Sequence, residues 1–131
     1  TVLDRTNVRH LRPVDLPYVP ALVVGDLSFI SLTKVLPALV TVAPDADFVL
    51  LVKPQFEVGK GHVGKGGVVR DAAAHAWAIA TVADTAAGLG LGVAGLTRSP
   101  LPGPSGNIEF VMWMRSGAGD LDPVRVAEVT S

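Results

Sequence analysis

The sequence predicts an α/β fold built on a mostly parallel sheet, and three observations support that prediction. The composition is aliphatic, with 49% hydrophobic but only 5% aromatic residues among 131, which is typical of buried parallel strands covered by small-residue helices. Short apolar runs of strand length alternate with segments of helical periodicity. The order strand, helix, strand in the first third of the chain forms a parallel crossover unit by default.

The first predicted strand–helix–strand unit covers residues 20–54. Residues 20–26 (PALVVGD) are an apolar run closed by glycine and aspartate, which is typical of a buried strand. A helix should begin after Ser28 or Ser31, either of which can cap it, and Pro37 should kink it. Residues 47–54 (DFVLLVKP) predict a second buried strand. The helix is predicted from four apolar residues with helical spacing: Leu32, Val35, Leu36 and Leu39.

The second half of the chain predicts a loop, a helix and two more strands. Residues 55–70 are rich in glycine and read as a loop that is longer than connections in compact domains usually are. Asp71 can cap a helix that ends near Gly88. Strands are predicted at 91–98 and 108–115, and we expect these two to be antiparallel neighbours. The fold therefore corresponds to an open sheet from which the first strand–helix units have been removed.

The predicted domain organisation is one folded unit followed by a tail. A chain of 131 residues is long enough for one packed core and too short for two ordinary domains. We expect residues 1–115 to form that unit, beginning with the end of an earlier strand at 1–10. Residues 116–131 are polar and predict only a short helix near Val124 to Val129.

Bulk properties limit the classes of protein that fit. The net charge of −1 gives no global signal for nucleic acid, so any RNA contact must be local or supplied by other sequence. The absence of cysteine excludes disulfides and thiolate metal sites and is compatible with a cytoplasmic location. The longest apolar runs are far shorter than the roughly 20 residues that span a bilayer. We therefore predict no membrane segment.

Two charged residues follow directly after predicted parallel strands. Asp26 ends the first strand and Lys53 ends the second, and ligands of open α/β sheets bind beyond the carboxyl ends of such strands. A carboxylate and an ammonium group in one crevice suit proton removal from a weak acid. Glu109 lies among apolar residues at the start of the last predicted strand. If that strand is antiparallel to the one before Lys53, Glu109 can join the pair; otherwise it is an outward-facing edge residue.

The glycine-rich loop resembles two nucleotide-binding motifs without fitting either. Residues 59–64 (GKGHVG) match the dinucleotide fingerprint GxGxxG, and residues 59–66 nearly match a P-loop, with Gly66 at the Ser/Thr position. Both motifs require a strand immediately before and a helix immediately after. Here the strand ends several residues upstream, and no helix opens at the third glycine of residues 59–64.

The charge of the same loop suggests a different role. It carries Lys60, Lys65 and Arg70 against one acid, Glu57. Such a loop suits contact with RNA phosphates. A surface loop without a ligand is the alternative.

Other polar and aromatic residues give weaker signals. His10, His62 and His75 have no spacing that suggests a metal site, so we expect surface histidines and no metal. Ser105 lacks the glycine pattern of a nucleophile elbow. The two tryptophans, Trp77 and Trp113, are interpreted as core or edge packing residues.

Three segments together resemble a known family. VVGDLSFISL (23–32), LLVKPQFEVGKG (50–61) with GGVVRD (66–71), and SPLPGPSGNIEFVMW (99–113) are similar to successive signatures of the haemolysin-A (TlyA) family of FtsJ-like ribosomal RNA 2′-O-methyltransferases. The resemblance covers nearly the whole chain, from about Asp4 to Arg115. It implies the C-terminal half of a Rossmann-like, S-adenosylmethionine-dependent methyltransferase sheet, mostly parallel with an antiparallel last strand.

The resemblance also implies roles for individual residues. FtsJ-like enzymes share a lysine, aspartate, lysine, glutamate tetrad, and by motif its last three members are Asp26, Lys53 and Glu109. The first lysine, the glycine-rich cofactor loop and an S4-like RNA-binding domain are expected upstream of Thr1. Asn7, together with Asp26, is expected to border S-adenosylmethionine.

The implied reaction is in-line attack of a ribose 2′-hydroxyl on the sulfonium methyl group, with ribosomal RNA of both subunits as substrate. Lys53 would deprotonate the hydroxyl or stabilise the resulting oxyanion, while Asp26 and Glu109 would orient Lys53 and the ribose. Two alternatives remain. One is a membrane-active haemolysin, which needs an amphipathic or transmembrane element. The other is an inactive fragment that forms a homodimer through an uncovered sheet edge, and we expect this chain by itself to be inactive.

Overall fold

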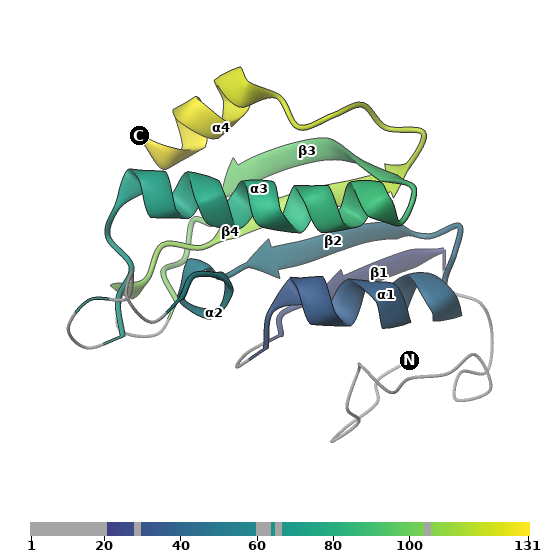
Figure 1. Ribbon diagram of the computed structural model, residues 1–131, viewed down its shortest axis with the longest axis horizontal. Helices are drawn as coiled ribbons and strands as arrows, with labels where there is room; N and C mark the ends of the chain where they lie inside the picture. Colours follow the sequence, from purple (N-terminus) through teal and green to yellow (C-terminus); the bar gives the residue numbers. More distant parts are fainter. Residues whose placement is uncertain (1–20, 28–29, 60–63, 65–66, 104–105) are drawn as a thin grey trace.

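The computed structural model combines helices and strands and describes residues 21–27, 30–59, 64, 67–103 and 106–131 (Figure 1). The element order within these ranges is β1 (Leu22–Gly25), α1 (Leu32–Val42), β2 (Asp47–Val52), α2 (Pro54–Glu57), α3 (Ala72–Gly88), β3 (Leu91–Arg98), β4 (Phe110–Ser116) and α4 (Pro123–Thr130). The early strand expected at 1–10 lies outside the described residues.

The described strands form one mixed sheet with the order β1-β2-β4-β3. β1 pairs with β2 in parallel, whereas β4 is antiparallel to both β2 and β3. The first three strands along the chain therefore run in the same direction and only the last is reversed. This confirms the predicted sheet, mostly parallel with an antiparallel last strand. It also brings the ends of β1 and β2 to the edge at which β4 begins, because Val52 pairs with Phe110.

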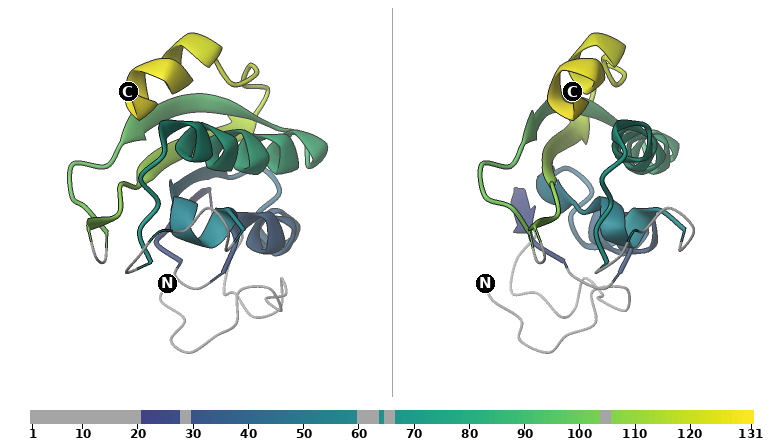
Figure 2. Two further views of the ribbon diagram at one scale, coloured as in Figure 1. Left: turned by 60° about the vertical axis from the view of Figure 1, so that its left-hand side comes forward. Right: turned by 90° about the vertical axis from the view of Figure 1, so that its left-hand side faces the viewer.

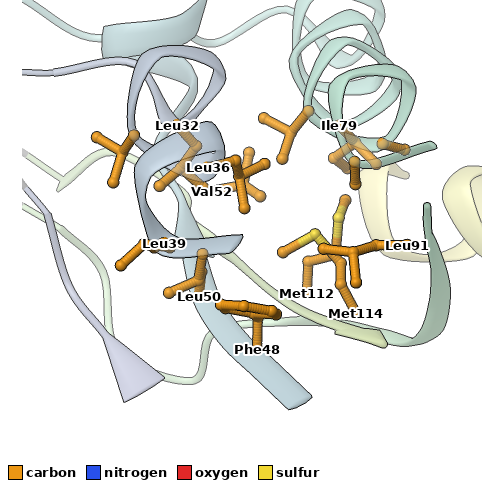
Figure 3. Close-up of a cluster of buried hydrophobic side chains, with 14 of the residues drawn as sticks. Leu32, Leu36, Leu39, Phe48, Leu50, Val52, Ile79, Leu91, Met112 and Met114 are labelled. Atoms are coloured by element: carbon orange, nitrogen blue, oxygen red, sulfur yellow. The ribbon is translucent and has the colours of Figure 1, made fainter. Parts of the chain in front are cut away.

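The hydrophobic core lies between the sheet and the helices on one of its faces. α1 and α3 lie side by side over that face (Figures 1 and 2). Every second residue of the two central strands points toward them, and Figure 3 shows these side chains meeting the apolar stripes of both helices. The central strands contribute six buried side chains: Phe48, Leu50, Val52, Phe110, Met112 and Met114.

The opposite face of the sheet carries apolar side chains that solvent reaches. Leu22 and Val24 on β1 are 57% and 71% exposed. On β4, Trp113 is partly exposed, and its indole Nε1 donates a hydrogen bond to Asp47 Oδ2 at 2.9 Å. Arg115 lies over the same ring, 5.2 Å from its centre. Trp113 thus packs on the solvent-facing surface of an interior strand, and the expectation of a core or edge residue was wrong.

The two long helices begin at the caps that the sequence predicts. Of the two serines considered for α1, Ser31 is the cap, and its Oγ accepts a hydrogen bond from Thr33 N at 3.1 Å. Asp71 caps α3 in the same way, with Oδ1 accepting from Ala73 N at 2.9 Å. Pro37 lies inside α1.

The structure differs from the sequence prediction immediately after Lys53. Residues expected to open a loop form the single-turn helix α2 instead, with Val58 N donating to Pro54 O at 3.0 Å. Proline is well suited to the first turn of a helix because its φ is already helical and its missing N–H is not needed there. Four residues are too few to show a helical period. The prediction of an uninterrupted loop over 55–70 was therefore wrong at its start.

Two boundaries near the end of the chain also differ. β4 begins at Phe110, so Glu109 lies just before the strand rather than within it, and its carbonyl still accepts from Ser99 N at 2.8 Å. The predicted short helix near the C-terminus is α4, which Asp122 caps through Val124 N at 3.0 Å. Val129 of α4 is buried in the core. The tail thus contributes an apolar contact that its polar composition concealed.

Candidate active site

Asp26, Lys53 and Glu109 come together at one edge of the sheet. Asp26 follows β1, Lys53 follows β2, and Glu109 precedes the antiparallel β4. The Nζ atom of Lys53 forms an ion pair with Asp26 Oδ1 and lies 4.0 Å from Glu109 Oε2. The condition on which the predicted role of Glu109 depended, a last strand antiparallel to β2, is met.

The three side chains differ in their exposure to solvent. Lys53 and Glu109 are each 4% exposed, whereas the side chain of Asp26 is 62% exposed. A buried ammonium group and a buried carboxylate are tolerated when they face each other, because each offsets part of the other's desolvation cost. The solvent-accessible side of the cluster is therefore at Asp26, and its charged interior is held away from water.

Two residues that the sequence did not single out contact Glu109. Gln55, on α2, donates from Nε2 to Glu109 Oε2 at 3.1 Å. Gly103 lies so close that a Cβ atom at this position would overlap the Glu109 carboxylate. The signals were weak: Gln55 lies two residues beyond Lys53 in an expected loop, and Gly103 is one glycine in a Pro/Gly-rich turn. Glu109 is thus fixed from two sides besides Lys53.

Glu57 is a third residue that no pattern along the chain singles out. It ends α2, and its carboxylate reaches the N-terminus of α1, where Oε1 accepts from Ser31 Oγ at 2.5 Å and Oε2 accepts from Leu32 N at 2.8 Å. Burial raises the pKa of Glu57 above its ordinary value of 4.5, although both hydrogen bonds act in the opposite direction. Two hydrogen bonds therefore hold the Glu57 carboxylate in place, while burial disfavours its ionised form.

The raised pKa of Glu57 predicts a specific effect of pH on stability. Because the folded chain binds this proton more tightly than the unfolded chain, the free energy of unfolding falls as pH rises from 4.5 through the raised pKa. Glutamine stays neutral, and its amide can accept from Leu32 N and donate to Ser31 Oγ. We expect Glu57→Gln to gain stability over the native chain across that pH window. Urea unfolding at several pH values measures this difference, and a pH-independent difference would contradict the prediction.

The expectation of a surface histidine was wrong for His75, which is buried on the inner side of α3. Its Nε2 lies 2.8 Å from Val69 O, which makes Nε2 the donor, and its ring meets Phe110 edge-on with centroids 5.6 Å apart. The helical spacing of His75 with the buried residues Ala78 and Ile79 is the signal that could have placed it in the core.

Asn107 joins the end of the glycine-rich loop to the segment that carries Glu109. Its Oδ1 accepts from Val69 N at 2.9 Å, and its Nδ2 donates to Gly67 O at 2.9 Å. Asn107 is 3% exposed, and its hydrogen bond with Val69 is shielded from water. The residues just before α3 are thereby tied to the start of β4, beside the charged cluster.

Of the remaining predicted site residues, the structure describes only Arg70. Arg70 is exposed near the start of α3, while Asn7, Lys60 and Lys65 lie outside the described residues, as do His10, His62 and Ser105. Trp77 is 53% exposed and lines a surface pocket of about 380 Å³ with Val58 and Asp71, so it is not a core residue. Within the described ranges, no group of three or more potential ligands could hold a metal ion.

The fold agrees with comparisons with known proteins. The FtsJ-like methyltransferase family matches residues 1–116, and the chain belongs to that family. Over 116 residues it is 57% identical to the 16S/23S rRNA (cytidine-2′-O)-methyltransferase TlyA of Mycobacterium tuberculosis, an alignment that covers 88% of this chain and 43% of TlyA. It is 43% identical over 113 residues to YqxC of Bacillus subtilis, a candidate rRNA methyltransferase, covering 85% of this chain and 40% of YqxC.

A solved structure gives the same result for the fold. A candidate hemolysin from Streptococcus thermophilus superposes with a TM-score of 0.89 at 38% identity, covering 96% of this chain and 47% of that one. The chain therefore spans less than half the length of these relatives. In the part of the chain that the structure describes, no helix is both long and apolar enough to cross a bilayer.

Proposed function

We propose that this chain is the C-terminal, catalytic half of an enzyme that transfers a methyl group from S-adenosylmethionine to a ribose 2′-hydroxyl of ribosomal RNA. One observation carries the proposal. In a member of the FtsJ-like family, a buried lysine lies between two carboxylates where parallel strands end. Such a group suits the activation of a weakly acidic hydroxyl.

The proposed catalytic roles follow from the chemistry of these three side chains. A ribose hydroxyl is a very weak acid, so the developing negative charge on its oxygen must be stabilised as its proton passes to water on the exposed side of the cluster, at Asp26. Lys53 is the only described cation in the cluster and is assigned this task. Asp26 and Glu109 hold its ammonium group from two sides, which restricts its motion. Because the cluster is preorganised, little reorientation is needed during the reaction.

The cofactor is assigned to the exposed side of the same cluster. S-adenosylmethionine supplies an electrophilic methyl group on a positively charged sulfonium, and it also carries an ammonium group. An exposed carboxylate at the end of a parallel strand fits such a ligand, and Asp26 is that residue. Asn7 is proposed as a second contact from its sequence motif alone. The remaining cofactor contacts are proposed to come from sequence upstream of this chain.

The proposed RNA contacts rest on the charge of three side chains and on the similarity of this chain to TlyA. TlyA acts on cytidines of 16S and 23S rRNA, as its name states, and we propose rRNA of both subunits as the substrate here. Lys60, Lys65 and Arg70 are proposed to contact phosphates, together with an upstream S4-like domain. Arg70 is exposed, as this role requires.

Isothermal titration calorimetry with S-adenosylmethionine tests the division of the cofactor site. We expect no measurable binding to this chain and clear binding to a version extended upstream to the length of TlyA. Tight binding to this chain alone would show that the cofactor site is not divided. If neither version binds, the methyltransferase proposal itself fails.

A further inference from the structure

Glu57 links the two segments that carry Asp26 and Lys53. It lies four residues after Lys53, and its hydrogen-bond partners Ser31 and Leu32 lie five and six residues after Asp26. Its two carboxylate oxygens are used for these two contacts, at 2.5 and 2.8 Å. These two contacts, which we call the Glu57 bracket, therefore join the segment that follows Lys53 to the segment that follows Asp26.

The start of α1 does not depend on Glu57 for its cap. Ser31 already caps this helix through Thr33 N, and Lys34 N donates to Ser31 O at 3.1 Å. A carboxylate at a helix N-terminus gains from the helix dipole, but at this site the gain is opposed by burial. Stabilisation of α1 alone does not require a side chain from α2, the helix that directly follows Lys53. The connection between the two segments is the feature that needs an explanation.

α2 also reaches the third member of the cluster. Gln55, two residues before Glu57, donates to Glu109 Oε2 at 3.1 Å. Phe56 N donates to Lys53 O at 2.9 Å, so the turn is anchored to the backbone of the lysine itself. One short helix thus holds Glu109 through Gln55 and the segment after Asp26 through Glu57.

We propose that Glu57 is a positioning residue for methyl transfer, which holds Asp26 and Lys53 in register by joining the segments that follow them. This inference rests on the proposed function. Glu57 acts through the ion pair and not by touching the substrate. A displacement of about 1 Å at a reacting group can reduce a rate by roughly a hundredfold, so losing the bracket should slow the chemical step more than it weakens substrate binding.

Steady-state kinetics of the extended enzyme, with ribosomal subunits and S-adenosylmethionine, test this role. We expect Glu57→Ala to lower kcat by about tenfold or more, with both KM values within about threefold of the native values. Glu57→Gln should recover most of the lost kcat, because its amide can make both hydrogen bonds. The matched control is Val82→Ala in the buried face of α3, which lowers stability without touching the bracket.

The outcomes separate this proposal from the function on which it rests. If Glu57→Ala loses no more kcat than Val82→Ala, or if glutamine does not rescue it, Glu57 has no positioning role. If Glu57→Ala does not fold, Ser31→Ala removes one of the two hydrogen bonds together with the cap of α1, and Asp122→Ala, which removes only the cap of α4, is its control. A kcat in Ser31→Ala no lower than in Asp122→Ala overturns the proposal. Loss of Lys53 tests the function itself. Full activity in Lys53→Met would contradict the proposed function, independently of the results for the Glu57 variants.

Discussion

Replacement of Lys53 by methionine is expected to reduce methyl transfer by roughly a thousandfold, within the range that positioned acid–base groups contribute. Methionine is similar in length to lysine but has no ammonium group to face Asp26 and Glu109. The two carboxylates would then lie near each other without a cation between them. The loss should appear in kcat when the extended enzyme is assayed with S-adenosylmethionine and ribosomal subunits.

The same substitution should also lower stability, because Glu109 is buried and would lose its charged neighbour. Removing one partner of a buried ion pair costs about 3–5 kcal/mol, and circular dichroism in urea measures this cost separately from activity. Lys34→Met is the matched control, since Lys34 is exposed on α1. It should change neither kcat nor unfolding. Equal losses of kcat in both variants would show that Lys53 has no special role.

Gly103→Ala is expected to give the second large loss of activity, about tenfold to a hundredfold, by moving Glu109. The added methyl group would occupy space that the Glu109 carboxylate fills. Gly103 N also donates to Asn107 O at 2.8 Å, so the turn cannot easily move away. Glu109 must therefore shift from its position 4.0 Å from Lys53 Nζ.

The control for this variant lies in the same turn. Leu101 is 75% exposed, so Leu101→Ala should keep full activity. A crystal structure of the Gly103→Ala enzyme, or its kcat, checks the displacement. An unchanged kcat, with Glu109 in its native position, would contradict the proposed role of this close contact.

Much of the fold was predictable because apolar residues recur along the chain with the spacing of helices and strands. The apolar spacing of Leu32, Val35 and Leu36 predicted α1, and the runs at 20–26 and 47–54 predicted two strands that the structure confirms as parallel. Helix caps were predictable for the same reason, since Ser31 and Asp71 act on residues next to them. α2 was missed because a single turn has no period to detect.

The candidate site was predictable only in part, because some of its contacts join residues far apart in the sequence. Asp26 and Lys53 stand out as charges at the ends of apolar strands. Glu57 and Gln55 do not, since their partners Ser31 and Glu109 are 26 and 54 residues away. Gly103 is recognisable only once the Glu109 carboxylate is seen beside it. Pairings of this kind depend on the tertiary fold, which a pattern along the chain does not report.

The most direct test of the account is to locate the methyl group that the enzyme transfers. The extended enzyme is incubated with radiolabelled S-adenosylmethionine and unmethylated ribosomal subunits, and the digested RNA is separated into nucleosides. We predict label in 2′-O-methylated cytidine with the native enzyme and none with Lys53→Met. Label on a base, or equal labelling by the two enzymes, would contradict the assignment of Asp26, Lys53 and Glu109 to ribose methylation.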